Sequence, residues 1–169
     1  MKNGPTIRKA APGDERGIAE LWKELMDHLK ECDPQYARTP EGHKMFAGIV
    51  LGCINGENSG VFVAEEGGAI VGYCMCQVGG YPAWTLLHGE RNGGITDLCV
   101  AGKHRRKGIG EALFRAARDW LRKQRARRIE ALGVTTGNRE ASAFWREMGF
   151  STCSQTLALP DTHNGATQR

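Results

Sequence analysis

The chain has 169 residues, of which 40% are hydrophobic and 25% charged, and this composition is typical of one globular domain. No apolar run reaches the length of a membrane span and the N-terminal residues lack the core of a signal peptide, so the sequence predicts a cytoplasmic protein. The net charge of +4 suits a small anionic ligand as well as nucleic acid, so it excludes neither.

The first half of the chain predicts a strand, two helices and a hairpin. Apolar residues recur at helical spacing in two stretches, and Gly67-Gly68 is a typical hairpin turn. These elements are expected at residues 6–10 (strand), 18–29 and 45–53 (helices), and 61–64 and 70–78 (strands). The glycine-rich residues 79–94 predict an irregular surface excursion.

The second half predicts strands that alternate with helices. The expected elements are strands at 95–101, 129–134 and 150–159, and helices at 109–121 and 138–148. The helix at 109–121 crosses over between two strands, so we expect those strands to be parallel within a mixed α/β sheet that has helices on its faces. We expect one domain over residues 1–159 and a polar, mobile tail at 160–169.

The most informative motif is the run Arg105-Arg106-Lys107-Gly108-Ile109-Gly110, which joins the strand at 95–101 to the long helix. The first N–H groups of a helix have no intrahelical partner, and the helix dipole adds partial positive charge there. A glycine-bearing loop at such a place is typical of phosphate binding, and three cations reinforce it. The structural alternatives are a tight turn for the glycines and a solvated charge run for the cations.

A second block runs from Asn138 to Phe150 and carries Asn, Ala, Phe, Gly and Phe at the spacing Asn-x-x-Ala-x-x-Phe-Tyr-x-x-x-Gly-Phe, with Trp145 in place of Tyr. The two blocks and the order of elements over residues 5–159 resemble the GNAT superfamily of N-acetyltransferases. The resemblance implies the GNAT fold: a mixed, mostly antiparallel sheet with a central, splayed parallel strand pair and helices on both faces. It implies an activity class without naming a substrate.

The resemblance also implies that acetyl-CoA lies between the strands at 95–101 and 129–134, with its pantetheine paired to backbone and its pyrophosphate on the N–H groups of residues 105–110. Asn138, Phe144 and Trp145 are expected near the pantetheine, although Asn138 has the alternative of being only a helix N-cap. The implied cofactor-binding residues are Leu98, Cys99, Val100, Arg105, Arg106, Lys107, Gly108, Ile109, Gly110, Asn138, Phe144 and Trp145.

Acetyl transfer needs a base for the amine and a donor for the oxyanion. Asp97 is the expected base because it is an acid in an otherwise apolar strand, on one face with Cys99 and Ala101. Its alternative role is to hold backbone N–H groups or a nearby Arg. The resemblance implies an oxyanion donor at the N–H of Leu98 or Cys99. His88 and Glu90 are second-rank candidates for the base or for substrate binding.

Trp145 departs from the family pattern, in which many relatives have a Tyr that is thought to protonate the leaving thiolate. Indole supplies no such proton at neutral pH. Cys99 and Tyr73 are alternative acids, and a thiol with a pKa near ~8.5 also leaves with only modest help. We therefore expect a slower enzyme without the Tyr, and Trp145 packed on the pantetheine is a further expectation.

The sequence thus predicts direct acetyl transfer from acetyl-CoA to an amine, with a non-catalytic acyl-CoA-binding module of the same fold as the alternative. The acceptor stays open among an amino acid, a polyamine, an aminoglycoside-like compound and a protein amine. Candidate acceptor contacts are Glu65, Glu66, Glu90 and residues 33–36.

Other partners follow from composition and resemblance. The basic run at 122–128 ends a helix and lacks interleaved aromatic residues, so nucleic acid is not expected. The six cysteines have no zinc-ligand spacing, so we expect reduced thiols and no metal. Dimers are common among relatives, which favours a homodimer.

Overall fold

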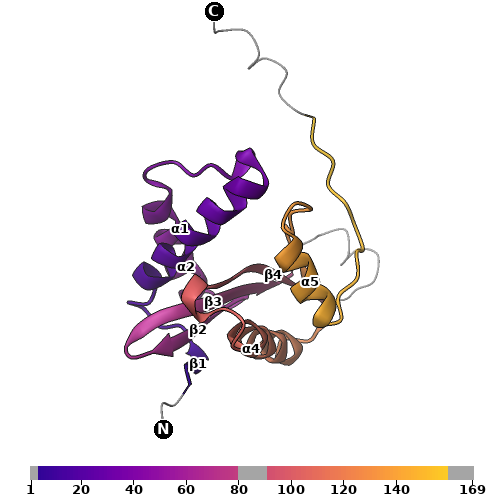
Figure 1. The fold of residues 1–169 in the computed structure, drawn as a ribbon. Coiled ribbons are helices and arrows are strands. Elements are labelled where there is room, and N and C mark those ends of the chain that lie inside the picture. The colour runs from indigo at the N-terminus through magenta and orange to yellow at the C-terminus, as the bar shows by residue number, and fades with distance from the viewer. Residues whose placement is uncertain (1–3, 80–90, 160–169) are drawn as a thin grey trace, which may run out of the picture.

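The computed structural model describes residues 4–79 and 91–159 (Figure 1). Its strands are β1 (Thr6–Lys9), β2 (Ser59–Glu66), β3 (Ala69–Val78), β4 (Arg91–Val100) and β5 (Ala126–Ala131). Its helices are α1 (Glu15–Cys32), α2 (Gly42–Asn55), α4 (Ile109–Lys123) and α5 (Arg139–Glu147), with 3-10 turns η1 (Pro34–Tyr36) and η2 (Gly102–His104). None of these helices is long and apolar enough to cross a membrane.

The five strands form one mixed sheet in the order β1-β2-β3-β4-β5. The first four pair antiparallel, and β4 and β5 pair parallel because α4 crosses over between them. This confirms the predicted mixed sheet and its parallel pair. The pair lies at one end of the sheet instead of at its centre, because no strand follows β5 in the described part of the chain.

Helices cover both faces of the sheet, as predicted (Figure 1). On one face α1 and α2 bury Ile18, Leu21, Phe46 and Val50 against strand residues such as Tyr73. On the other face α4 supplies the buried stripe, and α5 packs beside it. The residues of that stripe are Ile109, Leu113, Phe114, Ala117 and Leu121.

A β-bulge in β4 decides which side chains face which helices. Asp97 lies opposite Met75 and Ile95 lies opposite Cys76, so Thr96 is the extra residue. Ile95 therefore packs on the α4 face, whereas Cys99 packs on the α1 face. From Asp97 onward the predicted alternation holds, because Leu98 and Val100 pack against the α4 face.

Two expected strand boundaries and one expected strand were wrong. Residues 91–94, taken as irregular, belong to β4, and β5 begins at Ala126 instead of at residue 129. The strand expected at 150–159 is absent: Phe150 packs in the core, and residues 151–159 are exposed without regular structure. Leu157 and Leu159, at the end of that expected strand, are 84% and 95% exposed.

Candidate functional site

The outer edge of β4 is only half paired. β5 pairs with β4 from Arg91 to Ile95, and the last contact is the Leu132 N–H donating to the Ile95 carbonyl at 2.9 Å. Beyond it, the only strand that pairs with β4 within residues 4–79 and 91–159 is β3. The two strands of the parallel pair thus part at Ile95, and one edge of β4 is left without a strand.

The backbone of Leu98 faces this unpaired edge. The Ala101 N–H donates to the Val71 carbonyl at 3.0 Å, on the β3 side. Because backbone groups alternate in an antiparallel ladder, Cys99 also directs its backbone toward β3, and Leu98 and Val100 direct theirs outward. Of the two candidate oxyanion donors, the N–H of Leu98 therefore points to the unpaired edge, whereas the N–H of Cys99 points to β3.

The Cys99 side chain lies on the face of the sheet that packs against α1, and it does not line this edge. Its thiol is buried and lies 3.6 Å from the carbonyl of Leu21 in α1. Burial raises the pKa of Cys99 to about 12, so the thiol stays protonated and is a poor proton donor.

Arg105 makes its contacts with the protein itself. Its Nε donates to the Val100 carbonyl at 3.0 Å, and its two terminal nitrogens lie 3.7 Å from Glu24 and 3.9 Å from Glu140. Glu24 also accepts the Gly102 N–H at 2.7 Å. The side chain of Arg105 thus ties the loop to β4, α1 and α5, a role that the sequence did not reveal.

The rest of the loop leaves N–H groups and cations exposed at the start of α4. Arg106 and Gly108 adopt left-handed φ values of 61° and 78°, a turn geometry that gathers successive N–H groups. Gly108 is the N-cap and offers no side chain to the first turn of α4. Arg106 and Lys107 are exposed, and neither forms an ion pair within residues 4–79 and 91–159. This arrangement can hold a phosphate.

α5 begins beside this loop, and one of its first N–H groups is bonded to a side chain of the protein. The buried Asn138 accepts the Ala141 N–H at 3.0 Å, so it is an N-cap. Phe144, one turn further, points at α4: a Cβ added to Gly110 would lie 3.4 Å from its ring and 3.7 Å from Leu98. The structure therefore brings Leu98, Gly110 and Phe144 together.

Trp145 packs into an aromatic cluster between α4 and α5. Its ring centroid lies 5.7 Å from Phe114, 5.0 Å from Phe144 and 5.1 Å from Phe150, each in an edge-to-face arrangement. Such pairs stabilise a core beyond the area that they bury. Trp145 thus has a packing role in this helix pair.

Asp97 is half-buried on the α1 side of β4, directly after the bulge. Burial raises its pKa to about 6, and a hydrogen bond from the Thr96 hydroxyl acts in the opposite direction. A carboxyl with this pKa is ionised at neutral pH and can accept a proton there.

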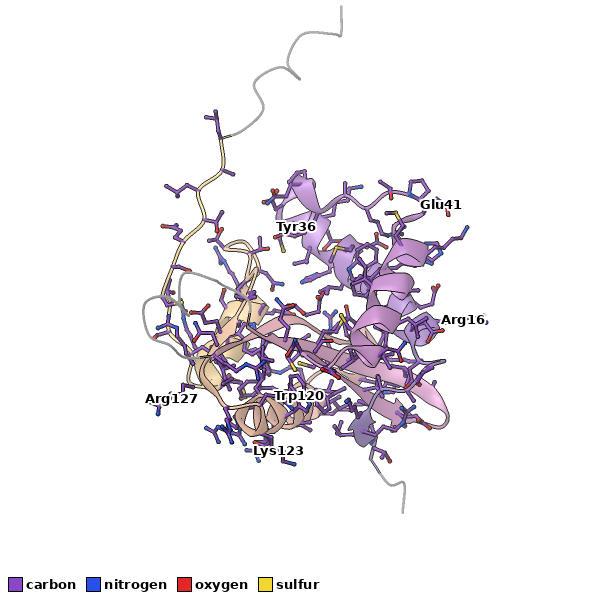
Figure 2. All side chains as sticks on the ribbon, turned by 180° about the vertical axis from the view of Figure 1, so that it is seen from behind. Arg16, Tyr36, Glu41, Trp120, Lys123 and Arg127 are labelled. Carbon is purple, nitrogen blue, oxygen red and sulfur yellow. The ribbon has the colours of Figure 1, made fainter. Side chains whose placement is uncertain are left out.

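The remaining candidates lie outside this site or are engaged elsewhere. Glu65 pairs with Arg8 at 2.7 Å, and Glu66 lies 3.1 Å from His104. Asp33 caps η1 by accepting the Gln35 N–H, and Figure 2 places Tyr36 at the outer end of α1. His88 and Glu90 lie outside the described residues.

Two other features bear on ligands. Lys123 and Arg127 lie at the far end of α4 and the start of β5 (Figure 2), so this basic run is remote from the loop at the start of the helix. Within the described ranges, no group of three His, Cys, Asp or Glu side chains could hold a metal ion.

Comparison with known proteins places these features in a family. The model of the acetyltransferase (GNAT) family matches residues 22–150, which include the loop, β4 and α5. The uncharacterized N-acetyltransferase YhfO of Bacillus subtilis is 26% identical over 144 residues, covering 85% of this chain and 88% of that protein. A streptothricin acetyltransferase of Streptomyces lavendulae is 43% identical over 65 residues, 38% of this chain and 34% of that one.

Solved structures are similar to this chain over most of its length. A variant of the BH1408 protein from Bacillus halodurans superposes with a TM-score of 0.81 at 26% identity, covering 92% of this chain and 98% of that one. An aminoglycoside antibiotic 6'-N-acetyltransferase from Acinetobacter haemolyticus has a TM-score of 0.71 at 14% identity, covering 92% and 97%. The second likeness concerns the fold alone.

Proposed function

Because the chain belongs to the acetyltransferase (GNAT) family, we propose that it transfers an acetyl group from acetyl-CoA directly to an amine. The single observation that carries this proposal is the juxtaposition of an unpaired edge of β4 with the uncapped start of α4. The edge can pair with an extended amide-bearing arm, and the helix start can hold phosphates.

In this proposal the pantetheine of acetyl-CoA pairs with the backbone of Leu98 and Val100, and the pyrophosphate rests on the N–H groups of residues 106–110. Arg106 and Lys107 are exposed cations beside those N–H groups and would add charge neutralisation. Arg105 is assigned to holding the loop, because its guanidinium is already engaged. The fit is supported by the open space at Gly108.

The proposed reaction begins with an amine that has lost its proton to Asp97. The amine nitrogen then attacks the thioester carbonyl carbon, and the Leu98 N–H donates to the oxyanion that forms. The C–S bond breaks and CoA leaves as a thiolate, while the attacking nitrogen loses its remaining extra proton to give the neutral amide. That proton reaches the thiolate through solvent, so CoA is released as a thiol. A transfer through an acetyl-cysteine is disfavoured, because burial keeps Cys99 protonated.

The acceptor is proposed only as an amine of a small molecule or a protein. The names of the relatives include streptothricin and aminoglycoside antibiotics, but these matches are partial or distant. A cytoplasmic location is proposed because all six cysteines are free thiols. A homodimer stays a prediction that analytical ultracentrifugation can measure.

The alternative function is a non-catalytic acyl-CoA-binding module. The observation that favours it is Trp145, which replaces a proton-donating Tyr and packs into the aromatic cluster. Both functions predict acetyl-CoA binding, so they differ only in turnover.

The test is an assay of free thiol release from acetyl-CoA with a panel of amines, on the wild type and on Asp97→Asn. We expect turnover by the wild type and a loss in kcat of about a hundred- to ten-thousand-fold in the variant, with the affinity for acetyl-CoA retained. Asp119→Asn is the matched control, because Asp119 pairs with Arg118 on the exposed side of α4. Tight acetyl-CoA binding without turnover for any amine would favour the alternative, and equal kcat in Asp97→Asn would remove this base.

A further inference from the structure

The helix α2 is apolar on all of its sides, although only one side packs against the protein. Residues 45–54 include no charged side chain. Phe46 and Val50 are buried in the core on the α1 side of the sheet. On the opposite side of the helix, Met45 is 69% exposed and Ile49 is 59% exposed. A helix that is apolar all round is normally covered on every side, and within the described residues this outer side of α2 has no cover.

Two glycines share this outer side with the large apolar residues. Met45, Gly48, Ile49 and Gly52 follow one another at the spacing of one helix face, and together they are called the outer face of α2. A Cβ added at Gly48 or at Gly52 would meet nothing within 4 Å. A glycine inside a helix destabilises it relative to alanine. Packing within one copy of the described residues therefore requires neither glycine, and their presence points to a contact outside that copy.

The outer face is complementary to itself when two copies of α2 pack antiparallel about a two-fold axis. With the axis between residues 48 and 49, Met45 of one copy lies opposite Gly52 of the other, and Ile49 lies opposite Gly48. Each large side chain then fills the space that a glycine leaves. The glycines also let the two helices approach closely, so the pairing explains both the exposed side chains and the glycines.

The charges at the two ends of α2 fit the same arrangement. Lys44, at the start of the helix, is 70% exposed and lies 2.8 Å from Glu41. Glu57, just beyond the end of the helix, is exposed and forms no ion pair within residues 4–79 and 91–159. Antiparallel packing brings the start of one helix beside the end of the other, so Lys44 of each copy lies between its own Glu41 and the Glu57 of the second copy. The two helix dipoles are then also opposed, which is favourable.

We propose that the outer face of α2 joins two copies of this chain in a homodimer, with an antiparallel pair of α2 helices at its two-fold axis. The helix is about 21 Å long at 1.5 Å per residue, and so short a contact suits a dimer that dissociates in the micromolar range. This contact lies on the α1 side of the sheet, whereas α4 packs on the other face. The inference therefore does not rest on the proposed acetyl transfer.

The test is sedimentation equilibrium of the full chain from low micromolar to submillimolar concentration. We expect a monomer–dimer equilibrium for the wild type and a Kd at least about tenfold higher for Ile49→Lys, because two like charges would meet at the axis. Leu157→Lys is the matched control, since it makes the same kind of change at an apolar residue that is 84% exposed in the C-terminal segment. It should dimerise like the wild type.

Gly48→Leu separates the contact between copies from the stability of one copy. Within one copy the leucine has open space and a better helix propensity than glycine, so the melting temperature of dilute protein should rise. In the pair it would collide with Ile49 of the second copy, so the dimer should weaken.

Three results would overturn the proposal: a wild type that is monomeric at every concentration, a dimer that persists in Ile49→Lys, or a Gly48→Leu variant that melts higher and associates as before. Acetyl-CoA plays no part in these measurements. A failure of the proposed function is therefore recognised separately, by absent turnover in a chain that still dimerises.

Discussion

The starts of α4 and α5 are neighbouring helix N-termini, and they differ in whether a side chain caps them. Each helix begins with N–H groups that lack an intrahelical partner. α5 satisfies part of this need internally, since Asn138 accepts the Ala141 N–H. α4 begins at Gly108, which has no side chain to offer. The fold thus occupies the start of α5 with its own side chain and leaves the start of α4 available to an anion.

The largest effect is expected from Gly110→Glu at the start of α4. A carboxylate there repels phosphates, and its side chain would extend from a position already near Phe144 and Leu98. We expect the Kd for acetyl-CoA to rise at least about a hundredfold in isothermal titration, with the fold retained.

Gly52→Glu in α2 is the control, because it makes the same change at a helical glycine with open space around it. It should bind acetyl-CoA like the wild type. Equal binding by both variants would mean that the start of α4 holds no anion.

The second effect concerns Asp97, which lies on β4 and outside both helix starts. Its pKa of about 6 predicts that kcat/KM falls as pH drops below 6, by about tenfold per unit. For stability the sign is the reverse: the folded pKa is above the unfolded value of 3.8, so the ionised form destabilises the fold as pH rises through about 6.

Thermal unfolding from pH 4 to pH 8 measures the predicted pH dependence of stability. Asp97→Asn should gain stability relative to the wild type as the pH increases, and identical curves would contradict a raised pKa.

The third effect concerns the exposed cations of the loop. Replacing Arg106 and Lys107 together by Ala removes two charges that have no ion-pair partner within residues 4–79 and 91–159. We expect the affinity for acetyl-CoA to fall several-fold at low salt and the difference to shrink as salt is added. Affinity that is unchanged at low salt would assign the binding to backbone N–H groups alone.

The smallest effect is expected from Asn138→Ala at the start of α5. Loss of the cap should lower the free energy of unfolding by ~1 kcal/mol in a denaturant titration. Asn138→Asp keeps an acceptor for the Ala141 N–H and should retain the stability. If Asn138→Ala instead weakens acetyl-CoA binding as strongly as Gly110→Glu, the two helix starts do not differ in the proposed way.

Much of the fold could be predicted because its elements are strongly periodic. α4 is the clearest case, since its buried residues recur at helical spacing. The start of β4 could not be predicted, because Gly93 and Gly94 normally interrupt strands. At Gly93 packing favours glycine, because an added Cβ would lie 2.8 Å from the fully buried Leu121.

The site was predictable in its motif and not in its side-chain contacts. The sequence identified the loop before α4, but the clamp from Arg105 to Val100 depends on tertiary contacts that no local pattern contains. The bulge at Thr96, which sets the face of Asp97, has no sequence signal either. The expected strand at 150–159 was wrong: residues 151–159 are exposed without regular structure, and the outer edge of β5 carries no further strand within the described residues.

The most direct measurement is the shift of backbone amide NMR signals when acetyl-CoA is added. We expect the largest shifts at residues 106–111 and at Leu98, and a small shift at Ala141, whose N–H is bonded to Asn138. Shifts centred on residues 122–128, or no shifts at millimolar acetyl-CoA, would contradict a cofactor site at the start of α4.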